Sequence, residues 1–507
     1  MRLFASITLG LAALFLCIGP VVAQPLTTAD HAWHGEPSGP HGENMEPGLW
    51  RSALNPAGLA QVTSPVPDWI RFGLLDVDGD LHRPQHPTGL RAFQFDAGGT
   101  AVLEEWHLHG GAHFTRRVDR RVDWAAVSDP NDRMAFAWAD SIGGAWYRNH
   151  VELEAAIGSP ALAGRLHGGV HLRYDIGQGA RRNNPRPLYR TRDLDLRPGI
   201  AVRLGEHHQL GALLHLTWAR EVNEFGELAT DDPFVYTLRG LGTFQRERIV
   251  RGERTRSGTR YGGGLQYTGQ LRNWQWDVGA LYKTGDTSIR EGTADPSFGG
   301  RHSTQEAQLR GAFRRSGTDL DAALRFEAGW WEGRGTDPIF RSVNIVAENS
   351  HIQAQFDVYP ADSGYSRDWQ AGLLVRLDNL SRRDIVRRTK WSAATVDAGL
   401  HGRIRQVLSS QLALHLRTSL RSRQPIATRY QARNPTRLTD DLVLPDYDYY
   451  ASARWEGRLR VGVGWRPAET ASDRVRLSVD WGQSVATTNR TDDRRRSLRF
   501  TLSVFAR

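Results

Sequence analysis

The chain has 507 residues, a formal net charge of +9, 39% hydrophobic residues and a single cysteine. One cysteine excludes a small secreted scaffold held together by disulfides, and arginines spread along the chain argue against nucleic acid as a partner. A mean hydropathy of −0.50 fits a soluble protein, but it also fits a transmembrane β-barrel, whose strands are apolar on one side only.

Residues 1–23 read as a secretory signal peptide. An apolar run from Leu3 to Val22 follows Arg2, and Val21 and Ala23 place small side chains at the −3 and −1 positions of a cleavage site. A retained membrane anchor is the alternative interpretation. Cleavage after Ala23 would remove Cys17, so the exported chain would depend on its size or architecture for stability.

Residues 24–67 precede the first expected strand and form an N-terminal segment, either periplasmic or inside the barrel. The stretch from Leu49 to Val62 predicts a short helix interrupted by Pro56-Ala57-Gly58. The run NPAGLA (55–60) resembles the hatch segment of long-chain fatty-acid channels, which lies inside their barrel. The resemblance implies a plug that includes Trp50, Asn55, Pro56 and Gly58.

Residues 68–507 alternate between apolar and polar side chains in runs of about 9 to 14 residues, as transmembrane strands do. In RLHGGVHLRYD, for example, Leu166, Val170, Leu172 and Tyr174 share one side. Eighteen strands are expected near 69–77, 89–97, 104–117, 147–158, 162–175, 192–204, 208–220, 258–270, 272–285, 303–315, 318–331, 350–359, 367–379, 391–404, 408–421, 447–465, 473–484 and 496–505.

The connections between these strands alternate between long and short, which a barrel entered from the periplasm requires and a soluble β-sandwich does not. The stretch 234–244 would break this order if it crossed, so it is assigned to a loop. The prediction is therefore an all-β fold, a transmembrane antiparallel β-barrel of about 18 strands (range 16–20).

Aromatic residues are expected in two bands facing lipid, one at each membrane interface. The periplasmic band comprises Trp69, Trp106, Trp274, Trp276, Trp369 and Trp465, and the outer band comprises Tyr174, Trp218, Tyr282, Trp330, Trp391 and Trp481.

The polar side of the strands is expected to line a lumen too wide for wall side chains to fill. The predicted lining residues are Arg165, Arg173, Arg325, Arg376, Asp397, Arg403, His415, Arg417 and Arg476. More arginine than carboxylate would favour the passage of anions. Alternatively, these charges pair across strands and only keep the interior hydrated.

The histidines suggest a candidate site for a divalent metal, and no other cofactor is expected. His107, His109 and His113 cannot share one ion, because successive strand residues are about 3.3 Å apart and zinc–nitrogen bonds are about 2 Å. A tight turn at 158–161 would instead place His150 opposite His171, with His113 on the next strand. Hydrated lumen histidines without a metal are the alternative.

Three stretches carry a broader resemblance: DGDLHRPQ (78–85), ADSIGGAWYRNHVELEAAIGSP (139–160) and GQGARRNNPRP (177–187). Together they are similar to an uncharacterised outer-membrane β-barrel family common in Bacteroidota, over residues from about 48 to the end. The resemblance implies an outer-membrane location and this fold, with solute uptake or passage as an inference.

The expected function is an outer-membrane channel or transporter that passes a small solute through an arginine-rich lumen. Alternatives are a non-conducting binding or assembly barrel that serves a surface uptake complex, and a hydrolase at the barrel rim. No enzyme motif is present, so an enzyme is not expected. The expected partners are outer-membrane lipid and lipopolysaccharide, the barrel-assembly machinery and, in the binding alternative, uptake proteins.

Overall fold

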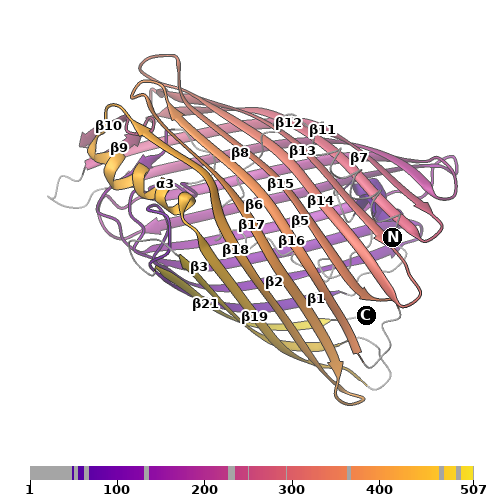
Figure 1. Cartoon of the computed structure of the whole chain (residues 1–507). Coiled ribbons are helices and arrows are strands. Elements are labelled where there is room, and N and C mark those ends of the chain that lie inside the picture. The colour runs from indigo at the N-terminus through magenta and orange to yellow at the C-terminus, as the bar shows by residue number, and fades with distance from the viewer. Residues whose placement is uncertain are drawn as a thin grey trace.

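The computed structural model describes residues 48–50, 55–61, 68–130, 136–226, 234–248, 251–292, 294–361, 367–467, 473–486 and 493–505. The predicted signal peptide and residues 24–47 lie outside these ranges. The main element is an 18-stranded sheet in which every neighbouring pair is antiparallel, and it closes because the first strand pairs with the last, Trp69 opposite Phe505. Figure 1 shows the resulting barrel.

Its strands in chain order are β1 (Trp69–Gly79), β2 (Gly89–Leu103), β3 (Trp106–Arg120), β5 (Trp146–Gly158), β6 (Leu166–Arg181), β7 (Leu188–Arg203), β8 (His208–Gly226), β11 (Arg251–Leu271), β12 (Trp274–Glu291), β13 (Ser297–Arg315), β14 (Leu320–Thr336), β15 (Val343–Pro360), β16 (Arg367–Asp384), β17 (Thr389–Val407), β18 (Leu412–Ala432), β19 (Arg454–Trp465), β20 (Val475–Ala486) and β21 (Arg494–Phe505). The predicted fold class and strand number are confirmed. The predicted strand 447–465 is wrong at its start, because residues 439–451 form the helical pair η3 (Thr439–Val443) and α3 (Leu444–Ala451).

The barrel has two unlike ends. At one end β1 begins, β21 ends and the turns are short, such as the one between Leu271 and Trp274; short turns mark the periplasmic end of such barrels. At the outer end, three connections exceed 20 residues: 121–145, 227–250 and 433–453. Among the described residues, no helix is long and apolar enough to cross a membrane.

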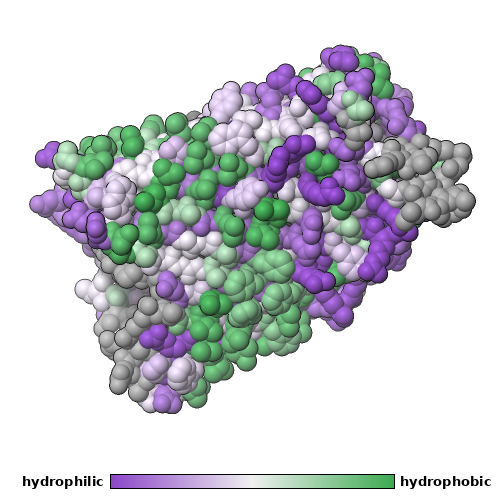
Figure 2. All heavy atoms as spheres, turned by 180° about the vertical axis from the view of Figure 1, so that it is seen from behind, coloured by the Kyte–Doolittle hydropathy of each residue, from purple (hydrophilic) through white to green (hydrophobic). Residues whose placement is uncertain are grey.

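Side chains alternate between the two faces of the wall, as the period of a strand requires. In β1, Ile70, Phe72 and Leu74 are exposed on the outside, whereas Leu75 and Val77 are buried on the inside. Apolar side chains cover much of the outer wall, and hydrophilic ones gather towards the end with the long loops (Figure 2).

Two aromatic residues do not join the lipid-facing bands predicted for them. Trp69 is 6% exposed and takes the inward position, because β1 is apolar on both sides and its outward positions are the even-numbered ones. Trp391 is 1% exposed and packs inward, against Val443 and Tyr450. Trp106, Trp218, Trp274, Trp465 and Trp481 are exposed on the outside, as expected.

A second, three-stranded sheet lies at the outer end, in the order β10-β9-β4. It consists of β4 (Trp138–Ala139), β9 (Phe234–Leu238) and β10 (Phe244–Arg248). The stretch 234–244 therefore lies outside the barrel wall, as predicted. Figure 1 places β9, β10 and α3 together at the outer end of the barrel.

Candidate functional site

The predicted lumen residues lie, with one exception, on inward-facing positions of the wall. Those on strands are Arg173, Arg325, Arg376, Asp397, Arg403, His415, Arg417 and Arg476. Arg165 is placed differently: it is exposed in the periplasmic turn between β5 and β6, before β6 begins at Leu166. Their role in solute passage stays a prediction.

Several of these charges are paired with neighbours on the wall. Arg376 donates to Asp378 at 2.6 and 2.7 Å. Asp397 accepts two hydrogen bonds of 2.6 Å from Arg423, a fork that guanidinium and carboxylate groups form readily. Arg173 lies 2.8 Å from Glu152. Asp397 and Arg173 are thus paired across strands, as the alternative interpretation expects, whereas Arg376 is paired within its own strand β16.

The proposed three-histidine patch does not assemble as predicted. His113 and His150 are close, with ring centroids 6.2 Å apart, but the register pairs His150 with Gly177 and His171 with Ala156. The connection between β5 and β6 extends from 159 to 165, longer than the tight turn predicted, so the register shifts and His171 moves towards the periplasmic end. Within the described ranges, no three His, Cys, Asp or Glu side chains are grouped to hold a metal.

The histidines pair with carboxylates instead. His113 Nδ1 lies 2.5 Å from Asp96 and His401 Nε2 lies 2.6 Å from Asp357. Further pairs on the inner wall are His150–Asp175, His215–Asp195, His351–Glu327 and His415–Asp473. Each pair joins an imidazole to an acceptor that orients it. The sequence alone does not reveal these pairs, because they depend on strand register.

The N-terminal segment, meaning residues 48–50 and 55–61, lies against the inner wall near the periplasmic end. Its 3-10 helix η2 (Pro56–Gln61) rests where the wall has glycines. A Cβ built on Gly169 would lie 2.4 Å from the carbonyl carbon of Pro56, and one on Gly199 would lie 2.3 Å from Asn55 Oδ1. Only glycine permits this close approach.

Polar and aromatic contacts hold the segment in place. The fully buried Asn55 donates to the backbone carbonyls of Ile200 and Ala212, each at 3.3 Å. Trp50 packs edge-on against His109 and His171, with centroids 5.5 and 5.8 Å apart. The four predicted plug residues, Trp50, Asn55, Pro56 and Gly58, are all buried against the inner wall; whether they obstruct passage stays a prediction.

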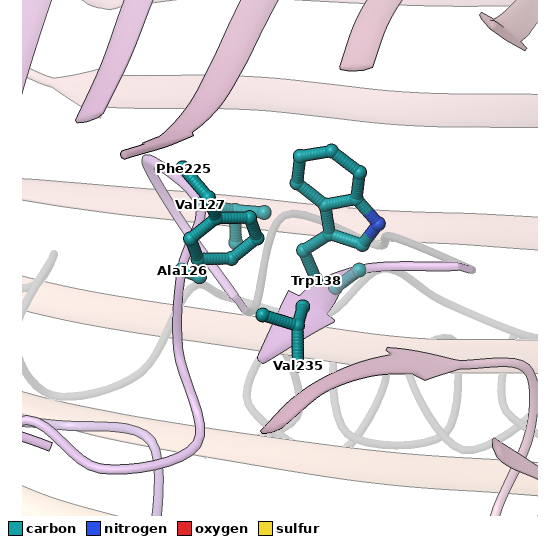
Figure 3. Close-up of a cluster of buried hydrophobic side chains, with 6 residues drawn as sticks. Ala126, Val127, Trp138, Phe225 and Val235 are labelled. Atoms are coloured by element: carbon teal, nitrogen blue, oxygen red, sulfur yellow. The ribbon is translucent and has the colours of Figure 1, made fainter. Parts of the chain in front are cut away.

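The described parts of the three long outer loops fold together, and we call them the outer cap (residues 121–130, 136–145, 234–248 and 433–453). One apolar cluster joins Ala126, Val127 and Trp138 to Val235 and to Phe225 of β8 (Figure 3). A second joins Trp124 and Tyr236 to Leu438 and Leu442. The cap thus has a hydrophobic core of its own, which meets the wall at Phe225.

The outer cap contacts strands on several sides of the barrel. It touches β8 through Phe225, β12 through Ile289, which packs on Phe136, and β17 through Trp391. Because these positions face inward, and β8 and β17 lie seven strands apart around the closed sheet, the cap extends across the outer mouth. The sequence predicts these stretches only as long connections between strands, although Trp124, Phe136 and Trp138 are a signal of a folded element.

Buried ion pairs anchor the cap to the barrel and its loops. Arg181 of β6 lies 2.7 Å from Asp140, with both side chains at 0% exposure. Arg239 forks onto Asp337 at 2.5 and 2.9 Å. Arg83, in the loop between β1 and β2, lies 2.5 Å from Asp446 of α3. Removing one partner of such a pair leaves a buried charge uncompensated.

Charge and stacking reinforce each other around α3. Burial alone would lower the pKa of the Arg83 guanidinium, but the carboxylate of Asp446 outweighs that effect and raises it. Burial raises the pKa of the Tyr450 phenol above its usual value, so its ring is neutral. The ring stacks on Trp391 at a centroid distance of 5.6 Å. Arg83 also lies over Tyr450, at 5.0 Å.

A closed antiparallel barrel with an apolar outer wall and a charged interior is the architecture of outer-membrane proteins. The chain is therefore an outer-membrane-type β-barrel, carrying an outer cap and an N-terminal segment on its inner wall. It belongs to a family described as a family of unknown function (DUF6850), which it matches over residues 56–506. No curated protein matches the chain.

Solved structures share the barrel at very low sequence identity. The ferric citrate transporter FecA in its unliganded form is 10% identical with a TM-score of 0.40, over 86% of this chain and 78% of that one. The copper transporter OprC is 9% identical with a TM-score of 0.40, over 86% and 80%. A Pseudomonas aeruginosa FadL homologue is 9% identical with a TM-score of 0.34, over 96% and 99%. Likenesses this distant do not indicate a substrate.

Proposed function

We propose that the protein passes a small solute across the outer membrane through its lumen, with the outer cap as the barrier at the cell surface. The supporting observation is the charged inner wall of an 18-stranded barrel, a size at which wall side chains leave room for water. The proposal includes an exported chain, a location in the outer membrane and no enzymatic step.

The outer cap and the N-terminal segment favour controlled rather than free passage. The cap crosses the outer mouth, whereas η2 covers only the wall formed by β3 and β5 to β7. In this proposal the segment narrows the lumen from one side, and the cap must move for a solute to enter from outside.

Ion conductance of the purified chain in planar bilayers tests the proposal. Wild type is expected to conduct weakly, and deletion of residues 24–60 is expected to increase conductance because it removes the segment from the wall. A barrel that stays silent in both forms, and also after the outer cap is loosened, would contradict passage.

The outer cap also favours a second candidate, a non-conducting barrel that binds a partner at the cell surface. A folded cap with an apolar core offers a defined surface, which unstructured loops would not. Co-purification of a specific envelope protein with a barrel that never conducts would favour this candidate over passage.

A further inference from the structure

We propose that the inner wall formed by β17, β18 and β19 is a binding site for a small solute that carries two or more oxyanion groups. This inference rests on the proposed function and names the class of solute. The site centres on Arg403, Arg417 and Arg460, which we call the arginine row.

The register places the arginine row on three adjoining strands at one level. Arg403 is directly opposite Arg417, and Arg417 is directly opposite Arg460. Directly opposed residues have Cβ atoms about 5 Å apart, and like charges in this relation destabilise a sheet. The arginine row therefore lowers the stability of the sheet, and it concentrates positive charge at one place on the wall.

The charge around the row is positive on balance. The inward positions from Asp397 to Val407 of β17, from Ala413 to Arg423 of β18 and from Arg454 to Gly464 of β19 carry these arginines: Arg403, Arg405, Arg417, Arg421, Arg423, Arg454, Arg458 and Arg460. Against them stand two carboxylates on the same positions, Asp397 and Glu456, and Asp397 accepts the fork of Arg423. Four carboxylates from adjoining positions also form ion pairs with members of this set: Asp368, Asp378, Asp473 and Asp480. The wall therefore carries a local positive excess that an anion can neutralise.

The row remains reachable from the lumen although its members contact their neighbours. Arg417 is exposed on its strand. The Arg403 side chain is 33% exposed and lies 3.8 Å from Asp368, and the Arg460 side chain is 28% exposed and pairs with Asp480. The Arg403–Asp368 ion pair at 3.8 Å in a hydrated lumen is weak, so a solute can compete for Arg403, whereas Arg460 is hydrogen-bonded to Asp480.

The row also faces the N-terminal segment across the lumen. Around the closed sheet, β18 lies nine strands from β7, halfway round, and β7 carries Gly199, on which Asn55 rests. Gly199 and Arg417 both lie among the six residues of their strands nearest the periplasmic end. A solute passing the segment must therefore pass beside the arginine row.

Spacing and chemistry define the ligand. Neighbouring strands are about 4.8 Å apart, so Arg403 to Arg460 spans about 10 Å along the wall. Guanidinium groups bind carboxylate and phosphate through two parallel hydrogen bonds. A small di- or trianion, either a polycarboxylate or an organic phosphate, can engage two or three members at once, whereas a single chloride ion is too small to span the row.

Calorimetric titration of the full-length protein in detergent, with pyrophosphate as the probe, tests the site. Wild type is expected to bind, and Arg417→Gln is expected to weaken binding at least tenfold, because the central arginine is lost. Arg417→Lys keeps the positive charge but cannot form the two parallel hydrogen bonds of a guanidinium group. Its affinity for pyrophosphate should therefore lie between those of wild type and Arg417→Gln. The matched control is Arg325→Gln, on the inward face of β14 and away from the row, which should change binding less than twofold.

Absence of wild-type binding would overturn the inference, as would equal losses in the Arg417 and Arg325 variants, which would indicate binding to general positive charge. The electrophoretic shift of the folded barrel on heating confirms that each variant is folded. Binding does not depend on conductance. A barrel that binds pyrophosphate at the row but never conducts would support the binding site and overturn the proposed passage. A barrel that conducts but does not bind pyrophosphate would support passage and overturn the binding site.

Discussion

Replacement of Arg83 by methionine should open the outer cap. The change leaves Asp446 buried on α3 without its partner at 2.5 Å, where the two side chains are 3% and 10% exposed. Breaking such a pair costs about 3–5 kcal/mol. Arg382, 3.7 Å from the other carboxylate oxygen, compensates in part, so a cost near the lower end, about 3 kcal/mol, is expected. At about 1.4 kcal/mol per factor of ten, the ratio of closed to open cap falls roughly a hundredfold.

Single-barrel recording in planar bilayers measures the ratio of closed to open cap, as the fraction of time for which the barrel is open. The control is Arg91→Met in the adjoining β1–β2 hairpin: Arg91 lies 2.6 Å from Asp76, but the two side chains are 72% and 44% exposed. A surface pair of this kind contributes at most about 1 kcal/mol, so the open fraction should change less than about fivefold.

The double variant Arg83→Met with Asp446→Leu separates loss of the pair from general damage. Since apolar replacement of a buried pair is often neutral or stabilising, the cap should close again. Equal open fractions for wild type and Arg83→Met would refute the view that this pair holds the cap. A double variant as open as the single one would show that shape, rather than the unpaired charge, is responsible.

Two further changes test the segment and the stacking beneath α3. Gly169→Val places a side chain where Pro56 lies, because a Cβ on Gly169 would come within 2.4 Å of the Pro56 carbonyl carbon. This variant should displace the N-terminal segment and expose it to protease. The control Gly110→Val, whose Cβ has nothing within 4 Å, should leave cleavage of the segment unchanged. Trp391→Ala removes the ring that stacks on Tyr450, and the packing of α3 on the wall should weaken by about 3–5 kcal/mol. The expected result is faster proteolysis at 433–453 while the barrel itself stays intact. Unchanged cleavage would contradict a stabilising role for the stacking.

The barrel wall could be predicted from the sequence because its signal is local. A strand with lipid on one side and water on the other alternates in chemistry with a period of two, and this period survives in almost every segment. Where both sides of a strand are apolar, the signal fails, as at Trp69, which takes an inward position on β1 with Arg71 over its ring.

Features that depend on register or on long-range contact could not be predicted in this way. A few extra residues in the turn 159–165 are enough to separate His171 from His150, because each residue of slip moves a partner by about 3.3 Å. The outer cap escapes prediction for another reason. Its core joins loops more than 200 residues apart, such as Trp124 and Leu438, and no local pattern records that contact.

The arginine row depends on both the local alternation of side chains and the register between strands. Alternation alone assigns Arg403, Arg417 and Arg460 to the inner wall, but only the register shows that they stand side by side. Opposite charges also meet across strands on this wall, as Arg460 of the row does with Asp480 and Arg423 with Asp397. Like charges are directly opposed at Glu152, Asp175 and Asp193, at Arg117 and Arg148, and again at the arginine row, where the opposition lowers the stability of the sheet. Such local conflicts between sequence and fold are expected at functional sites, and this one lies across the lumen from the N-terminal segment, where a solute would have to pass.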